Sequence, residues 1–259
     1  MKTKLIFFIL LLTVGLATVS ASGIQEQSRV VLAMPHHFDK IVVNGDKTVE
    51  VILDKNHKGY VVYNTADTLA QKLHCVVDST STLYVTGESA ANAVKSRVVI
   101  VACDSVTKVI NNLSGTILIK KLPRVADICL ISNGDSEIKC DEVSAGHLML
   151  SCNSEASMAV NNAKARFADI FNNASGALDI NKLQCHGTRI LNNSKGSITI
   201  KSIRTRRGEI LNNASGKVSV SGNAKAFAIV NYADGLIDLS GFNCKKQNRA
   251  NYGTGTISK

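Results

Sequence analysis

A motif that returns about every twenty residues constrains the fold of this chain more than any other feature. Its pattern is Asn-Asn-x-Ser-Gly-x-Ile-x-Ile. The clearest copies begin at Asn111, Asn172, Asn192 and Asn212, and looser copies begin at Ser132, Cys152, Asn231 and Asn251. A fixed repeat of this length is typical of a solenoid, in which each coil buries its apolar side only against the neighbouring coils.

Each repeat contains short stretches in which apolar and polar residues alternate. In one copy, Ile198 and Ile200 enclose Thr199, and the equivalent positions of the other copies are also mostly apolar, polar and apolar. Alternation with a period of two indicates a half-buried strand. The sequence therefore predicts a single-domain, all-β fold: a parallel β-helix or β-solenoid with coils of about twenty residues. A shared glycine column, which includes Gly196 and Gly216, predicts a sharp bend that requires positive φ or no side chain.

The first Asn of each motif forms a column in which like residues stack on like. Stacked Asn side chains can bond their amides from coil to coil. We therefore expect a structural Asn ladder rather than a ligand site. Its members are Asn111, Asn172, Asn192, Asn212, Asn231 and Asn251.

The start of the chain has the pattern of a secretory signal peptide. Lys2 and Lys4 precede an apolar run over residues 5–16, and small residues follow up to Ala21. We expect a signal peptide over residues 1–21, a linker over 22–35, opening coils or a cap over 36–90 and regular solenoid repeats over 91–259. No transmembrane segment is expected after the signal. The predicted location is periplasmic, outer-surface or extracellular, and the edge beyond Ile257 is expected to be unprotected.

Positive charge is concentrated at one point of each repeat. The chain carries a formal net charge of +10, which favours anionic partners. The basic positions form a candidate anion-binding edge: Arg124, Lys164, Arg166, Arg204, Arg206, Arg207, Lys225, Lys245 and Lys246. A solvated bend is the alternative interpretation. The expected partner is an anionic polysaccharide or lipopolysaccharide, without specific recognition of nucleic acid.

Two adjacent positions of the repeat are mostly apolar. They lie two and three residues before the second Asn of the motif. Because only one of two adjacent strand positions faces the core, the other forms an outward stripe, which usually marks a contact surface. This candidate contact stripe consists of Ile110, Ile131, Phe171, Leu191, Leu211 and Val230. It predicts a possible homo-oligomer, and a strand buried on both faces is the alternative.

No constellation of residues predicts catalysis, a metal site or a cofactor. Asp169 and Glu209 share a column with Arg189 between them, which favours ion pairs from coil to coil. His147 and His186 lie near the same phase of the repeat but two coils apart. The seven cysteines show no metal-binding spacing, and their positions are typical of small buried hydrophobic residues.

The segment before the repeats resembles a known family. Phe38, Ile41, Val43 and Gly45 are followed by two further alternating pairs, Val49 with Val51 and Leu83 with Val85. This pattern resembles the family of putative auto-transporter adhesins with a head GIN domain, over roughly residues 36–240. The strict Asn-Asn repeats and the many cysteines depart from the usual family pattern. The resemblance implies an exported bacterial β-solenoid without an established catalytic activity, and it transfers no functional residue.

Two functions remain open at this stage. The first is an exported, non-enzymatic, adhesin-like β-solenoid that binds a surface, an anionic polymer or itself. The second is a polysaccharide-active lyase or hydrolase built on the same scaffold, which requires acids and bases that converge on one exposed face.

Overall fold

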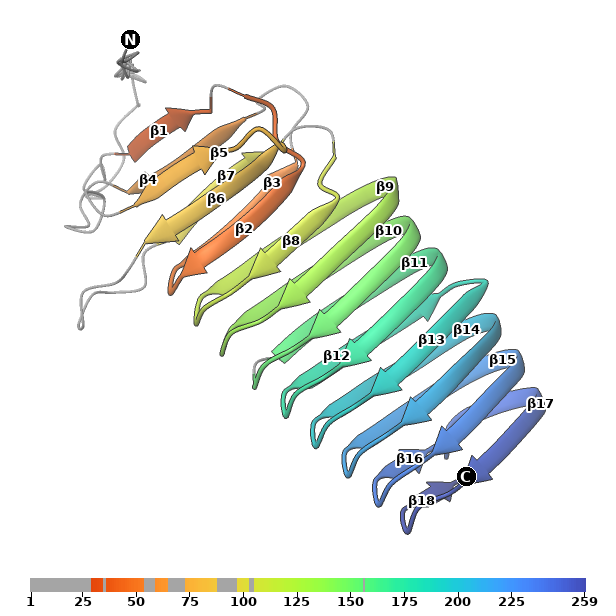
Figure 1. Ribbon diagram of the computed structural model, residues 1–259. Coiled ribbons are helices and arrows are strands. Elements are labelled where there is room, and N and C mark those ends of the chain that lie inside the picture. The colour runs from red at the N-terminus through yellow and green to blue at the C-terminus, as the bar shows by residue number, and fades with distance from the viewer. Residues whose placement is uncertain are drawn as a thin grey trace, which may run out of the picture.

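The protein is an all-β solenoid. The computed structural model describes residues 29–34, 36–53, 59–64, 73–87, 97–102, 105–155 and 157–259. Within these ranges every regular element is a strand, and the strands join into one eighteen-stranded sheet that winds along a rod (Figure 1). The predicted signal peptide, residues 1–21, lies outside the described residues.

The strands of the repeats stack in parallel and in register. They are β8 (Lys108–Asn111), β9 (Thr116–Ser132), β10 (Glu137–Cys152), β11 (Ser157–Asn172), β12 (Ala177–Gln184), β13 (Gly187–Asn192), β14 (Ser197–Asn212), β15 (Lys217–Asn231), β16 (Leu236–Asp238), β17 (Phe242–Asn251) and β18 (Thr256–Ser258). Ile138 pairs with Met158, and Ile180 pairs with Ile200, so in these coils each residue lies beside the one twenty positions further on. The period of the sequence is therefore the length of one coil.

Each coil has two walls and two corners. The first wall follows the Asn-Asn motif, as at residues 197–201, and the second wall precedes the next motif, as at residues 207–212. We call the corner at each motif the Asn turn. The opposite corner, as at Arg204–Arg206, is the basic bend, and β9, β10, β11, β14 and β15 run through it without a break. The Asn turns lie along one edge of the rod and the basic bends along the other (Figure 1).

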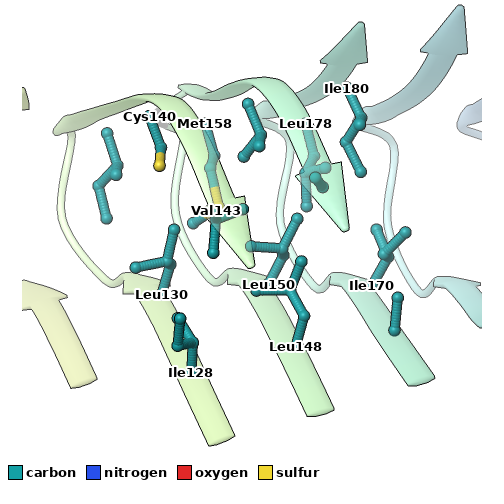
Figure 2. Packing of buried hydrophobic residues seen from close by; sticks show 14 of the residues in the cluster. Ile128, Leu130, Cys140, Val143, Leu148, Leu150, Met158, Ile170, Leu178 and Ile180 are labelled. Atoms are coloured by element: carbon teal, nitrogen blue, oxygen red, sulfur yellow. The ribbon is translucent and has the colours of Figure 1, made fainter. Parts of the chain in front are cut away.

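The core is a set of aliphatic ladders between the two walls. Ile180 and Ile200 of the first wall and Ile190 and Ile210 of the second wall are each at most 1% exposed. Figure 2 shows Met158 and Leu178 on one side of the core facing Leu150 and Ile170 on the other. Because the β-branched and leucine side chains of successive coils stack directly, each coil buries its neighbours. The predicted alternation of inward and outward positions is confirmed.

The N-terminal strands are stacked out of chain order. They are β1 (Arg29–Ala33), β2 (Lys40–Gly45), β3 (Thr48–Leu53), β4 (Tyr60–Asn64), β5 (His74–Val77), β6 (Thr82–Gly87) and β7 (Arg97–Ala102). Strand β2 pairs in parallel with both β6 and β8, and β3 pairs in parallel with both β7 and β9. The coil made by β2 and β3 therefore lies between the coil of β6 and β7 and the regular repeats.

Antiparallel strands cover the N-terminal end of the rod. Strand β4 pairs with β7, β1 pairs with β4, and β5 pairs with β6, all antiparallel. Strand β1 lies inside the stretch 22–35, for which the sequence predicts a linker. Its backbone pairs with β4 and so extends this end sheet. The boundary at residue 90 falls between β6 and β7, which belong to the same coil.

The C-terminal end carries polar residues where earlier coils carry core residues. Gln247 and Arg249 on β17 are in register with the buried Phe227 and Ile229 of β15. On the first wall Ile257 continues the ladder of Ile237 and is half-buried. The last described coil is therefore polar on the second wall, where the preceding coils are aliphatic.

Candidate anion-binding edge

The first Asn of the motifs forms the predicted ladder inside the Asn turns. Asn192 donates from Nδ2 to Oδ1 of Asn212 at 2.9 Å, and Asn212 donates to Asn231 at 3.0 Å. All three side chains are fully buried. Their amides also bond backbone carbonyls of their own turn, as Asn212 does with Gly216 at 3.2 Å. Side-chain bonds link Asn192, Asn212, Asn231 and Asn251, whereas the amides of Asn111 and Asn172 bond the backbone carbonyls of Gly115 and Gly176 in their own turns. Because every one of these amide groups donates within the protein, this inner ladder is structural.

The glycine column is required by this ladder. A Cβ placed on Gly216 would lie 2.4 Å from Nδ2 of Asn192 and closer still to the carbonyl oxygen of Gly196. Among the described glycines only Gly59 and Gly222 have positive φ. Of the two reasons predicted for this column, the lack of a side chain is therefore correct, and positive φ is wrong.

A second ladder runs outside the Asn turns, and sequence reasoning missed it. It consists of Asn44, Asn112, Asn133, Asn153, Asn173, Asn193 and Asn213, and each Nδ2 donates to Oδ1 of the preceding member. The inner ladder donates in the opposite direction, toward the C-terminus. The recurrence of the second Asn in each motif is the sequence feature that could have predicted this outer ladder.

The basic bends form a groove along one edge of the rod. The groove has a volume of about 700 Å³. Six of the nine predicted basic residues line it: Arg124, Lys164, Arg166, Arg204, Arg206 and Lys225. Arg207 faces a neighbouring hollow on the second wall, and Lys245 and Lys246 lie on the last coil. Gln184 and His186 also line the groove between the arginines and were not predicted as part of it.

The basic side chains of this edge are not neutralised by the protein. All nine are exposed, and among the described residues none of them has a carboxylate partner. Arg166 lies over the ring of Phe167, with Cζ 5.5 Å from the ring centroid. Gln184 lies in register between Lys164 and Arg204, so these two cations are two coils apart, at about 4.8 Å for each coil. Their repulsion is therefore weaker than the roughly 1 kcal/mol expected for like charges about 4 Å apart in water. A bound anion would relieve this repulsion.

The second wall carries paired charges, in contrast to the bends. Nε of Arg189 lies 2.6 Å from Oε1 of Glu209, and this hydrogen bond raises the pKa of Arg189. Asp169 pairs instead with Nε2 of His147 at 2.8 Å. The predicted ion pair from coil to coil therefore forms between Arg189 and Glu209. Asp169 pairs with His147 of the preceding coil instead of with Arg189. His147 and His186 lie on different surfaces, the wall and the groove.

The apolar stripe lies on the outer side of the second wall. Its members Ile110, Ile131, Phe171, Leu191, Leu211 and Val230 are half-buried, while the adjacent column, which includes Ile190 and Ile210, is fully buried. Of strands β1 to β7, β2 and β3 pair in register with β8 and β9 at the N-terminal end of the repeats, with Val42 beside Ile110, and therefore continue the stack instead of covering its outer side. The stripe is thus the outward one of the two apolar columns.

Five of the described cysteines are free thiols: Cys75, Cys129, Cys140, Cys185 and Cys244. The thiol of Cys152 donates a hydrogen bond to the backbone carbonyl of Ser154, and Cys103 lies outside the described residues. Burial raises the pKa of Cys75 and of Cys140 to about 12. In the part of the chain that the structure covers, no three His, Cys, Asp or Glu side chains are grouped to hold a metal ion. No helix there is long and apolar enough to cross a membrane.

These features define a parallel β-solenoid with polar ladders at one edge and unpaired cations at the other. The chain matches the family described as "Putative auto-transporter adhesin, head GIN domain" over residues 37–224, and it belongs to this family. The predicted resemblance is confirmed. A comparison with curated proteins finds no significant match.

Solved structures share the fold at low sequence identity. A putative adhesin from Parabacteroides distasonis has a TM-score of 0.75 and 16% identity, covering 90% of this chain and 96% of that one. A putative lipid binding protein from the same species has a TM-score of 0.72 and 16% identity, with the same coverage of 90% and 96%. A putative adhesin from Bacteroides fragilis has a TM-score of 0.63 and 14% identity, covering 90% and 97%. At these identities the likeness shows the fold alone.

Proposed function

We propose that this protein is an exported, non-enzymatic, adhesin-like β-solenoid that binds an anionic polymer along its basic bends. The observation that carries the proposal is the groove lined by six exposed cations without carboxylate partners among the described residues. The fold aligns these cations along the rod, so one extended ligand can contact several coils at once. The family and two solved neighbours are described as adhesins, which supports a binding role.

The alternative, a polysaccharide-active enzyme, finds less support in the geometry. Hydrolysis by paired carboxylates needs one acid and one base that are free to reach the substrate. Asp169 is bonded to His147, and Glu209 is bonded to Arg189. Incubation with an acidic polysaccharide should therefore release no new reducing ends. A time-dependent release that Glu209→Gln abolishes would favour the enzyme instead.

Charge reversal in the groove tests the binding role. The variant Lys164→Glu, Arg204→Glu and Arg206→Glu removes three cations that line the groove. A matched control, Lys120→Glu, Lys195→Glu and Lys201→Glu, makes the same change in net charge at three exposed lysines outside it. Binding to immobilised polygalacturonate should fall at least about tenfold in the groove variant and far less in the control.

Salt provides a second readout in the same experiment. Exposed charges are screened within a Debye length of about 8 Å at physiological ionic strength. Binding of the unmodified protein should therefore weaken steeply between low and physiological salt, and the groove variant should show a shallower dependence. Equal losses in the groove variant and the control would mean that net charge, and not this groove, determines binding.

A further inference from the structure

A hollow of about 320 Å³ lies on the second wall directly beside the basic groove. Three pairs of consecutive residues connect the two surfaces. Arg166, His186 and Arg206 line the groove, while the residues that follow them, Phe167, Gly187 and Arg207, line the hollow. A ligand that follows the basic bend can therefore place part of itself in the hollow.

Gly187 explains why the hollow exists at this coil. It is in register between Phe167 and Arg207, in an outward column where other coils carry side chains such as His147. A Cβ on Gly187 would lie 2.8 Å from Cδ1 of Phe167 and 3.9 Å from Cγ of Arg207. The missing side chain lets the Phe167 ring lean over the backbone of the next coil. Phe167 is 37% exposed, and Cζ of Arg166 lies 5.5 Å from its ring centroid, so the exposed part of the ring is an apolar surface that directly adjoins the cations of the groove.

The polar lining of the hollow differs from that of the groove. Asp169 and Glu209 both line it, together with Arg189 and Arg207. Each carboxylate has one partner, His147 or Arg189, and retains further acceptor capacity, because a carboxylate offers about four lone-pair sites. Carboxylates accept hydrogen bonds from hydroxyl groups but repel phosphate oxygens. The hollow thus combines an exposed aromatic ring with acceptors for hydroxyl groups.

We infer that the hollow binds a sugar ring of an acidic polysaccharide whose anionic groups contact Arg166 and Arg206 in the adjoining groove. A sugar ring presents an apolar C–H face to Phe167 and hydroxyl donors to Asp169 and Glu209. Polyphosphate has neither a C–H face nor hydroxyl groups along its chain. The inference rests on the proposed function, because the groove supplies the attraction and the hollow supplies the selectivity for sugar.

The test compares polygalacturonate with polyphosphate of similar charge on the full-length protein at one salt concentration. The unmodified protein should bind polygalacturonate about tenfold more tightly. Phe167→Ala should lose about tenfold in affinity for polygalacturonate, which corresponds to about 1.4 kcal/mol, and retain its affinity for polyphosphate. Phe167→Tyr keeps the ring and should behave like the unmodified protein. Tyr232→Ala removes a different exposed ring, 53% accessible, and should change neither affinity.

The outcomes separate the two proposals. If Phe167→Ala binds both polymers as the unmodified protein does, or loses affinity for both equally, the sugar site is wrong and the groove remains. If the unmodified protein binds neither polymer, the proposed function itself fails. Gly187→Val provides a second variant, because its side chain displaces the ring while Phe167 stays in the sequence. It should also lose affinity for polygalacturonate alone, whereas Ala226→Val in the same column should not.

Discussion

Arg249 donates a hydrogen bond from Nε to Oε1 of Gln247 at 2.9 Å, within β17. These two residues stand where the preceding coil places the buried Ile229 and Phe227. An inward-facing charge at an open sheet edge disfavours pairing with another edge. The end of the solenoid is therefore polar where its middle is aliphatic.

Replacing this pair should convert the end into an adhesive surface. In the variant Gln247→Phe and Arg249→Ile, the aliphatic ladders of the second wall continue to the open edge. We expect concentration-dependent end-to-end association, measured by light scattering. The control Asn248→Ile adds an apolar residue at an exposed position between the two and leaves Arg249 and Gln247 in place. Association in the control alone, or in neither variant, would contradict this role.

The two Asn ladders should differ in their contribution to stability. Asn212 is fully buried and bonds Gly216, Asn192 and Asn231, so Asn212→Ala leaves buried polar partners unsatisfied. Such a loss costs about 1–3 kcal/mol for each group. Asn213→Ala removes a bond between exposed amides, and water replaces it. Urea unfolding should show a large loss for the first variant and less than about 1 kcal/mol for the second.

Equal losses in the free energy of unfolding would show that the two ladders contribute similarly to stability. Asn213 and Asn212 are adjacent in the same turn, so this comparison holds the coil and the backbone geometry constant.

Stability should decrease in alkaline solution through the buried thiols. Burial raises the pKa of Cys140 from 9.0 to about 12. Above pH 9 an exposed thiol in the unfolded chain loses its proton while the folded thiol keeps it, so the unfolded state gains stability. This contribution is fully present below pH 9 and is lost as the pH rises toward 12.

Cys140→Val isolates this effect. Cys140 is in register with Ile119 and Val160, so valine fits the ladder of the first wall. Thermal unfolding at several pH values should show a smaller decline between pH 9 and 11 for Cys140→Val than for the unmodified protein. Parallel declines would mean that Cys140 does not contribute to the alkaline loss.

The repeat predicts those features of the fold that arise when residues of the same type stack on one another in successive coils. The inward isoleucine columns, the inner Asn ladder and the basic edge all follow from the same residue type at the same offset, as with Ile180 and Ile200. The placement of β2 and β3 between β6–β7 and the repeats could not be predicted, because it depends on pairings between distant, non-repeating segments. The hollow at Gly187 was also missed, since it arises from a single departure from the repeat.

The outer Asn ladder shows a different limit. Asn193 and Asn213 were visible as a column, but the alternation did not say whether their amides bond one another or water. The direction of the side chains at a turn decides this, and the structure places successive amides 2.8 Å apart. Asn192 could be assigned because it lies two residues after Ile190, a member of an inward column, so the alternation places both side chains inside.

The apolar stripe should mediate pairing of two copies of the protein. Phe171, Leu191 and Leu211 are in register on successive coils and face outward, half-buried. A second rod presents the same stripe with the same spacing, so the surface is complementary to itself about a twofold axis. Leu191→Lys with Leu211→Lys should shift the protein from dimer to monomer in light scattering and leave its melting temperature nearly unchanged.

A matched variant on the other wall controls for the added charge. Thr199→Lys and Ser219→Lys change two half-buried, outward residues on adjacent coils and should leave the dimer intact. An unmodified protein that is monomeric at all concentrations would contradict the pairing. So would a loss of several kcal/mol in the leucine variant, because losses of that size are typical of buried positions. In that case the stripe would be covered within a single chain and would not be free to meet a second copy.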